Sequence, residues 1–212
     1  MKKYLRIIPN DKKLYLFDFC GTIFNCNTTM EYLAFIANKS GLIVKLRFLF
    51  YGLIAKIIKT IGLIDKTAHV RLRVKTLKGI SKDKLSEFSV EFIEWLLLKH
   101  KNVRVYDQLV KLRESGKNVQ LVTATLEGVA KKFAEREKIE IALSSTLEFR
   151  EDGVCTGKYK FQVYPHTKAQ HIISKFNQKA LQDAVFITDD SYADDDLLGL
   201  VGYPVLIIEE SK

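Results

Sequence analysis

The sequence predicts an α/β protein in which a parallel sheet carries an all-helical insertion after its first strand. Three observations indicate this class. An apolar, aromatic run at residues 13–19 has the character of a buried strand, and residues 29–101 contain helical patterns but no good strand. From about residue 103 onward, strands and helices alternate, as is typical of parallel sheets. The helical block is therefore interpreted as an inserted cap.

The first strand ends in a polar turn at Gly21-Thr22, after which the periodicity changes to that of helices. Four helices are expected in the insertion, at residues 30–38, 42–61, 65–77 and 82–100. In the last of these, apolar side chains recur at steps of three and four residues, and Ser81 precedes it as an N-cap.

The second half of the chain begins with a helix at 106–114 that ends at Ser115-Gly116. The elements expected after it are a strand at 118–123, a helix at 126–138, a strand at 139–143, a hairpin at 148–159, a helix at 166–176, a strand at 184–188, a short helix at 194–200 and a strand at 204–208. We therefore expect a core formed by residues 1–27 and 103–212, with a cap formed by residues 28–102.

Composition excludes several classes of protein. Of the 212 residues, 47% are hydrophobic, which excludes a disordered chain, and three cysteines are too few for a disulfide framework. The basic N-terminus lacks the long apolar stretch of a secretory signal, and no uncharged run approaches the ~20 residues needed to span a bilayer. A soluble, cytoplasmic protein is expected.

Positive charge is concentrated in the expected cap. Residues 31–105 contain 15 Lys and Arg against 6 Asp and Glu, whereas residues 106–212 contain 14 against 17. Residues 42–64 are apolar with interspersed Lys and Arg, which suits either packing against other cap helices or peripheral contact with a membrane interface. Nothing beyond the lysine content suggests nucleic acid, so no nucleic-acid partner is expected.

Polar side chains of a particular kind follow the predicted strands. Asp18 ends the first strand, Thr123 ends the second, Lys168 lies near the start of a helix, and Asp190 and Asp194 follow the strand at 184–188. Ligands of open α/β sheets bind at the carboxyl ends of strands. A carboxylate nucleophile, a hydroxyl donor, an ammonium group and further carboxylates for a hard cation together suit phosphoryl transfer.

In this order and spacing, Asp18-Phe-Cys-Gly-Thr22, Thr123, Lys168 and Asp190-Ser-Tyr-Ala-Asp194 resemble the four motifs of the haloacid-dehalogenase superfamily. The helical insertion between the first two motifs is similar to the C1-type cap of its phosphoserine-phosphatase-like subfamily, IB. The resemblance covers essentially the whole chain and implies a three-layer Rossmann-like sheet. It also implies a phosphatase that uses Mg²⁺ and acts on a small-molecule or lipid-like phosphorylated substrate.

The resemblance also implies a role for each matching residue. Asp18 would be the nucleophile and a Mg²⁺ ligand, together with the backbone carbonyl of Cys20 and the carboxylate of Asp190. Asp194 would support the metal directly, through water or by orienting a lysine.

The phosphoryl group would be held by a second set of residues. Thr123 would donate a hydrogen bond to it, Lys168 would neutralise its charge, Ala124 lies in the same phosphate-binding segment, and Thr22 would brace the loop that follows Asp18. Catalysis is thereby expected to rest on Asp18, Cys20, Thr123 and Lys168.

Cys20 departs from the pattern, because family phosphatases usually have a second Asp there as the general acid and base. A thiol with an ordinary pKa near ~8.5 replaces a carboxyl poorly in that role. We therefore expect a slow phosphatase. The alternatives are a phosphotransferase or phosphonate-bond hydrolase of the same superfamily, or a catalytically impaired domain that binds a phosphorylated ligand. The oligomeric state is not readable from the sequence.

Overall fold

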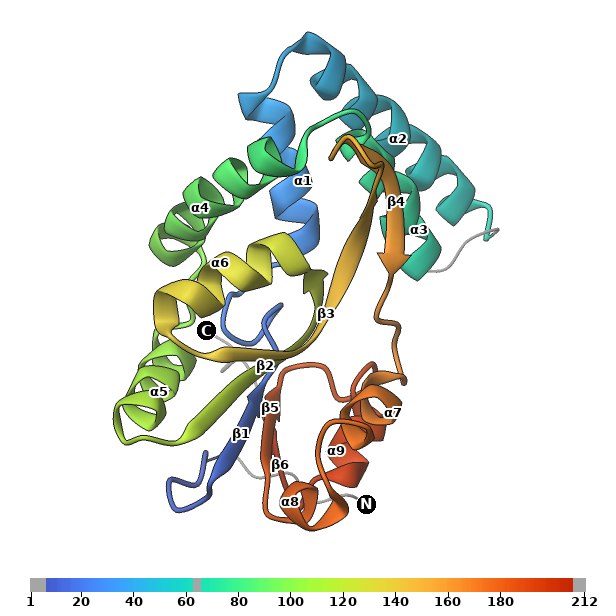
Figure 1. Ribbon diagram of the computed structural model, residues 1–212. Helices are drawn as coiled ribbons and strands as arrows, with labels where there is room; N and C mark the ends of the chain where they lie inside the picture. Colours follow the sequence, from blue (N-terminus) through green and yellow to red (C-terminus); the bar gives the residue numbers. More distant parts are fainter. Residues whose placement is uncertain (1–6, 63–65, 208–212) are drawn as a thin grey trace.

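The computed structural model describes residues 7–62 and 66–207, and the chain forms a six-stranded sheet of order β4-β3-β2-β1-β5-β6 (Figure 1). Its strands are β1 (Leu14–Phe17), β2 (Asn118–Leu126), β3 (Glu140–Phe149), β4 (Cys155–Phe161), β5 (Val185–Thr188) and β6 (Tyr203–Leu206). All neighbouring pairs are parallel except β3 and β4, which form an antiparallel hairpin. The predicted α/β class with a parallel sheet is confirmed.

Helices cover both faces of the sheet. One face is covered by α5 (Val103–Glu114) and α6 (Glu127–Glu137), and the other by α7 (Lys168–Ile173), α8 (Gln178–Gln182) and α9 (Asp195–Leu200). β1 and β5 are buried along their whole length between these layers, as the continuous apolar run in the sequence of β1 predicts.

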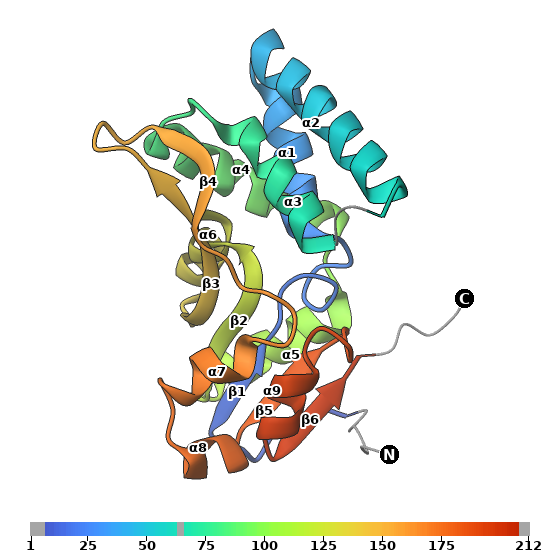
Figure 2. The same cartoon turned by 90° about the vertical axis from the view of Figure 1, so that its right-hand side faces the viewer.

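Between β1 and β2 the chain forms α1 (Thr28–Lys39), α2 (Leu42–Thr60), α3 (Lys66–Val74), a short 3₁₀ helix η1 (Lys75–Leu77) and α4 (Lys82–Lys99). Figure 2 shows these inserted helices lying beyond the end of the sheet at which β1 terminates. Their apolar side chains join one hydrophobic cluster with the α5–α6 face of the sheet, and Phe19, Phe24 and Phe133 meet edge to face within it.

The β3–β4 hairpin reaches away from the sheet and contacts the inserted helices. Backbone N–H groups of Gly79 and Lys82 donate to the carbonyls of Cys155 and Gly153, and the N–H of Cys155 donates to Ile80. Gly157 has φ +77° and lies against the backbone of η1, where a Cβ atom would come within 3.2 Å of the Lys75 Cα. The hairpin therefore braces the inserted helices from the core side.

Several predicted boundaries differ from the structure, and two of the differences have a clear physical cause. β3 continues through residues 144–147, where a break was expected, because the buried hydroxyl of Ser145 donates to the Ala124 carbonyl and accepts from the Val163 N–H. The helix expected at 166–176 begins only at Lys168, since His166 has φ +59°. Residue 65 of one expected helix and residue 208 of the last expected strand lie outside the described residues.

Candidate active site

The carboxyl ends of β1 and β5 lie side by side at the centre of the sheet. β1 pairs with β2 on one side and with β5 on the other. The strands that follow β1 in the sequence are therefore added first on one side of it, as β2 to β4, and then on its other side, as β5 and β6. Asp18 directly follows β1, and Asp189 and Asp190 directly follow β5. The N–H of Asp18 donates to the Ile187 carbonyl at 2.9 Å, which holds the two strand ends together. Crevices at such switch points are where ligands of open α/β sheets bind.

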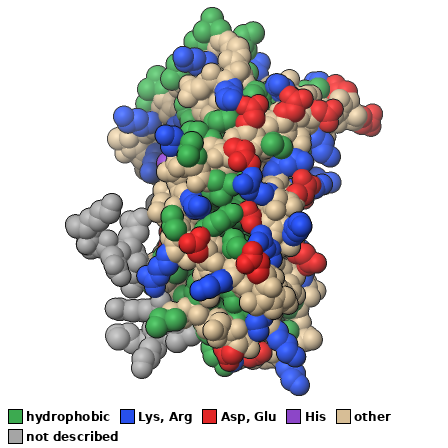
Figure 3. All heavy atoms as spheres, turned by 90° about the vertical axis from the view of Figure 1, so that its left-hand side faces the viewer, with side chains coloured by type: hydrophobic (Ala, Val, Ile, Leu, Met, Phe, Trp, Pro, Cys, Tyr) green, Lys and Arg blue, Asp and Glu red, His purple; other side chains and the backbone are tan. Residues whose placement is uncertain are grey.

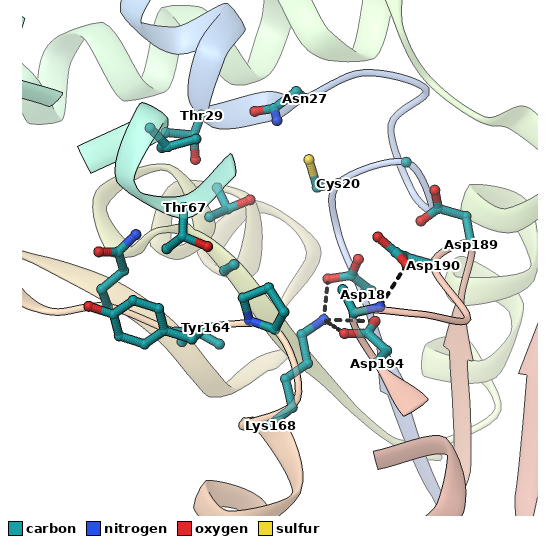
Figure 4. Close-up of a pocket in the computed structure, with 18 of the residues that line it drawn as sticks. Asp18, Cys20, Asn27, Thr29, Thr67, Tyr164, Lys168, Asp189, Asp190 and Asp194 are labelled. Carbon is teal, nitrogen blue, oxygen red and sulfur yellow. Dashed lines mark hydrogen bonds and ion pairs between the residues drawn. The ribbon is translucent and has the colours of Figure 1, made fainter. Parts of the chain in front are cut away.

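A buried cation lies between two buried carboxylates at this position. The Nζ of Lys168 is 3.1 Å from Oδ1 of Asp18, and 2.8 and 2.9 Å from the two carboxylate oxygens of Asp194 (Figure 4). All three side chains are at most 7% exposed. One positive charge compensates two negative charges, so the cluster is net negative and suited to a further cation.

The pKa values of the cluster reflect this balance. Burial raises the pKa of Asp18 to about 7, against the opposing attraction of Lys168. The pKa of Lys168 is raised by the Asp18 and Asp194 charges, although its burial acts in the opposite direction. Lys168 is therefore charged throughout the physiological range.

Asp194 is held by a second partner. The Thr188 hydroxyl donates to Asp194 Oδ2 at 2.7 Å and accepts from the N–H of Asp190 at 3.1 Å. Asp190 Oδ1 in turn accepts the N–H groups of Tyr192 and Ala193, at 3.0 and 2.8 Å. The loop after β5 is thus fixed by its own side chains, with Asp190 Oδ2 left without a hydrogen bond from the described residues.

Thr22 and Gly21 join the loop after β1 to the loop after β5. The Thr22 hydroxyl donates to Asp189 Oδ1 and accepts from the Asp189 N–H, both at 2.9 Å. Gly21 has φ +77°, and a Cβ atom built there would lie 2.1 Å from Asp189 Oδ2. This turn requires glycine for both its backbone conformation and the close approach of Asp189.

Cys20 lies in the loop at the mouth of this cluster. Its thiol donates to the Cys26 carbonyl at 3.2 Å, and its sulfur accepts from the Thr28 N–H at 3.3 Å. Burial and the neighbouring Asp18 charge raise the pKa of the thiol to about 12. The thiol is therefore neutral and a weak proton donor.

Thr123 and Ala124 stand near the end of β2, next to β1. Thr123 is fully buried and its hydroxyl accepts the N–H of Thr125 at 3.1 Å, whereas Ala124 and Thr125 line the cavity described below. The Thr125 hydroxyl is 2.6 Å from that of Thr28, the first residue of α1.

The segment before Lys168 is anchored to the loop that contains Asp194. The N–H of His166 donates to the Ala193 carbonyl at 2.8 Å, and its Nδ1 lies 2.7 Å from Asp195 Oδ1. The N–H of Ala169 donates to Asp196 Oδ2 at 2.7 Å. These contacts on both sides of Lys168 set where its side chain enters the cluster.

A cavity of about 440 Å³ lies between the strand ends and the inserted helices. Its floor is formed by Asp18, Lys168 and the loop after β5, and Figure 4 shows Cys20, Asn27, Thr29, Thr67 and Tyr164 around the remaining space. Arg71 of α3 donates to the Tyr164 hydroxyl and to Gln162 Oε1, which ties α3 to the segment between β4 and α7. The cavity is thereby walled on one side by the core and on the other by the insertion.

The model of the haloacid dehalogenase-like hydrolase family matches residues 15–197, which include every strand-end residue described above. The chain belongs to this family.

Solved structures show the same fold. A protein of unknown function from Bordetella pertussis Tohama I has a TM-score of 0.74 at 20% identity, covering 92% of this chain and 89% of the other. A substrate-bound phosphoserine phosphatase has a TM-score of 0.60 at 20% identity, covering 92% of this chain and 85% of the other. The phosphoserine phosphatase of T. onnurineus has a TM-score of 0.56 at 19% identity, covering 95% of this chain and 86% of the other. A search of curated protein sequences finds no match.

As a haloacid dehalogenase-like hydrolase, the chain is expected to hold its chemistry at the strand ends, and the structure brings Asp18, Lys168, Asp190 and Asp194 together there. Thr22 and Thr123 lie directly behind these residues and do not line the cavity. No group of three or more His, Cys, Asp or Glu side chains in residues 7–62 and 66–207 is arranged to hold a metal ion. The Mg²⁺ ligands expected from the resemblance include the backbone carbonyl of Cys20. A group made only of His, Cys, Asp and Glu side chains does not contain that ligand.

The cavity residues contributed by the insertion and by the segment after β4, such as Thr29, Thr67 and Tyr164, were not predicted from the sequence. They belong to no motif, and their position depends on how the inserted helices lie over the strand ends. Thr125 had a signal in the sequence, since it stands two residues after Thr123 on the same strand.

Proposed function

We propose that this protein is a Mg²⁺-dependent phosphomonoester hydrolase that forms an aspartyl-phosphate on Asp18. The observation that carries the proposal is the buried Lys168 ammonium between the carboxylates of Asp18 and Asp194, at the floor of a cavity in a member of a hydrolase family. The lysine keeps the Asp18 carboxylate oriented toward the cavity and offers a positive charge to the phosphoryl oxygens.

In the first step, an Asp18 carboxylate oxygen attacks phosphorus, the P–O bond to the leaving group breaks, and the leaving oxygen takes a proton from solvent water. In the second step, a water oxygen attacks phosphorus, the P–O bond to Asp18 breaks, and the attacking water gives a proton to the solvent. The Asp18 carboxylate is thereby regenerated and phosphate is released. Lys168 stabilises charge on the phosphoryl group in both steps, and Asp194 with Thr188 keeps the ammonium in position.

The donor set fits Mg²⁺, which prefers hard oxygen ligands. The candidate ligands are the carboxylates of Asp18 and Asp190 and the backbone carbonyl of Cys20, with Asp190 Oδ2 free of hydrogen bonds from the described residues. Both Asp194 oxygens are engaged by Lys168 and one also by Thr188, which favours a positioning role for Asp194 over direct ligation. When bound, the cation supplies charge neutralisation for the transferring phosphoryl group.

The proposal is tested by incubating the protein with p-nitrophenyl phosphate or acetyl phosphate, whose leaving groups need little protonation. Phosphate release that requires Mg²⁺ and stops on chelation is expected. If phosphate is not released and no phosphorylated protein appears by mass spectrometry, although Mg²⁺ binds, the proposal is wrong and a phospholigand-binding domain takes its place.

The Cys20 thiol makes turnover of alkyl esters slow. It is held in hydrogen bonds to Cys26 and Thr28, and its raised pKa leaves it unable to protonate an alkoxide leaving group efficiently. A long-lived phosphoenzyme is expected for a related reason, because activation of the attacking water needs a base and the thiol replaces the carboxylate that usually serves as one.

Cys20→Asp is expected to accelerate hydrolysis of an alkyl phosphate by ~10²–10⁴-fold, since a carboxyl replaces the thiol beside the leaving group. Hydrolysis of p-nitrophenyl phosphate should change far less, because its leaving group is stable as an anion. Steady-state kinetics on both esters measures the difference, and Cys20→Asn is the matched control without an acidic proton. An alkyl ester rate that stays at the wild-type value in Cys20→Asp would contradict this account.

The substrate class follows from the wall of the cavity that faces the cluster. The described residues of this wall carry no charged side chain. They are Cys26, Asn27, Thr29, Thr67, Val70, Tyr159, Gln162, Val163, Tyr164 and Pro165. Because an unpaired charge is costly to bury, this lining suits a neutral, hydroxyl-bearing leaving group such as a polyol or sugar, and disfavours an amino acid.

A comparison of glycerol phosphate with O-phosphoserine tests this assignment. The kcat/KM for glycerol phosphate is expected to exceed that for O-phosphoserine by roughly tenfold or more, because the ammonium and carboxylate of serine lose water without gaining partners. A higher kcat/KM for O-phosphoserine would show that charged groups outside the described lining recognise the substrate, and would overturn the assignment.

A further inference from the structure

The outward side of α2 carries a continuous row of exposed apolar side chains. Its members recur every three or four residues and are each more than half exposed: Leu42, Ile43, Leu46, Leu49, Phe50, Leu53 and Ile57, with Ile61 directly after the helix. We call these eight residues the α2 outer face. They make up more than half of the large exposed hydrophobic residues in the described part of the chain.

This exposure is not explained by a polar or loosely formed helix. α2 has 19 residues, yet Ala55 alone among them is fully buried. The opposite side of the helix, which includes Val44, Phe48 and Tyr51, is half-buried and packs toward α1, α3 and η1. α2 is therefore apolar on both sides, and its outer side has no partner among the described residues. Contiguous apolar surface of this extent marks an interaction site.

The charges on α2 indicate what it contacts. The helix contains Lys45, Arg47, Lys56 and Lys59 and no acidic residue. With about 3.6 residues per turn, Lys45, Lys56 and Lys59 fall along one edge of the outer face. All three are exposed, and none forms an ion pair with another described residue. Figure 3 shows hydrophobic and basic side chains along the upper left edge of the molecule, whereas acidic side chains lie at its upper right.

We propose that the α2 outer face docks onto the surface of an anionic lipid bilayer, with the helix axis parallel to the membrane plane. The apolar side chains enter the boundary between headgroups and acyl chains, and the lysines along their edge contact lipid phosphates. No described helix is long and apolar enough to cross a membrane.

A second copy of this chain fits the outer face less well than a bilayer does. The outer face is the ridge of one helix, whereas a stable protein interface needs a complementary groove or a paired seam. Two copies packed through α2 would also bring their uncompensated lysines together. An anionic membrane satisfies the apolar row and the lysines at the same time.

Sedimentation of the full-length protein with vesicles tests the proposal. Binding is expected to vesicles of phosphatidylcholine and phosphatidylglycerol at low salt, and to be much weaker with phosphatidylcholine alone or at high salt. The triple variant L46Q/L49Q/L53Q should lose this binding. The variant K45Q/K56Q/K59Q should weaken it by roughly 100-fold, because each lysine near an anionic surface contributes to the affinity.

The control is V90Q/L98Q, which changes two exposed apolar residues of α4 and should bind vesicles like the wild type. Thermal unfolding checks that all variants are folded, and the binding assay needs no turnover, so it is independent of the proposed phosphatase activity. Absence of vesicle binding by the wild type overturns the proposal. So does binding that survives L46Q/L49Q/L53Q, or a concentration-dependent dimer that this variant dissociates without any vesicle binding.

Discussion

Asp18→Asn is expected to reduce phosphate release from p-nitrophenyl phosphate by roughly 10⁴–10⁶-fold, because the amide cannot attack phosphorus. The substitution keeps the size and shape of the side chain, and Lys168 retains Asp194 as a partner. The fold should therefore persist. Mass spectrometry after incubation with acetyl phosphate should show an added phosphoryl group on the wild-type Asp18 peptide and none in the variant.

Asp107→Asn is the matched control, since Asp107 is an exposed residue of α5 that does not line the cavity. It should leave both the rate and the phosphoryl adduct unchanged. Phosphate release by Asp18→Asn at more than about a tenth of the wild-type rate would exclude Asp18 as the nucleophile.

Lys168→Met is expected to destabilise the protein as well as inactivate it. Removal of the ammonium leaves the carboxylates of Asp18 and Asp194 buried without their shared cation, and breaking a buried ion pair in this way costs about 3–5 kcal/mol. For a chain of this size, the melting temperature should fall by roughly 6–20 °C when measured in a chelator. Turnover should fall by ~10²–10³-fold or more, through loss of charge stabilisation.

The comparison variant is Lys158→Met, which removes an exposed lysine of β4 and should change the melting temperature little. Added Mg²⁺ should restore part of the stability lost in Lys168→Met, because a cation again compensates the carboxylates. If Lys168→Met melts at the wild-type temperature in the chelator, then Lys168, Asp18 and Asp194 do not stabilise one another.

The order and type of most elements could be predicted because each carries its own periodicity. The apolar run of β1 and the three- and four-residue steps of α4 are properties of short segments, and the structure has both. α8 (Gln178–Gln182) was missed, since five residues offer little periodicity beyond the N-cap Asn177. β3 was predicted as two pieces, because the hydrogen bonds that satisfy Ser145 come from residues distant in the sequence.

The candidate site could also be predicted only in part from the sequence. Asp18 and Asp190 could be named from the sequence because residues that follow parallel strands meet at one edge of the sheet. Lys168, which begins α7 after the antiparallel strand β4, could be named through the resemblance to the family motifs. The hydrogen bonds that position them could not, since Thr22 meets Asp189 and Thr188 meets Asp194 only after the loops have closed. The neutral wall of the cavity was also inaccessible, because Thr67 and Tyr164 come from segments without any motif.

The sequence by itself determined the α/β class, the helical insertion and the carboxylates at the strand ends, because local periodicity and strand direction are encoded residue by residue. The tertiary structure alone decided that one buried ammonium is shared by Asp18 and Asp194, that the described cavity wall facing this cluster is uncharged, and that α2 keeps its outer face exposed. Burial and pairing of charges depend on which distant segments meet, and a row of Leu and Ile has the same sequence pattern whether it faces a neighbouring helix or the outside of the molecule.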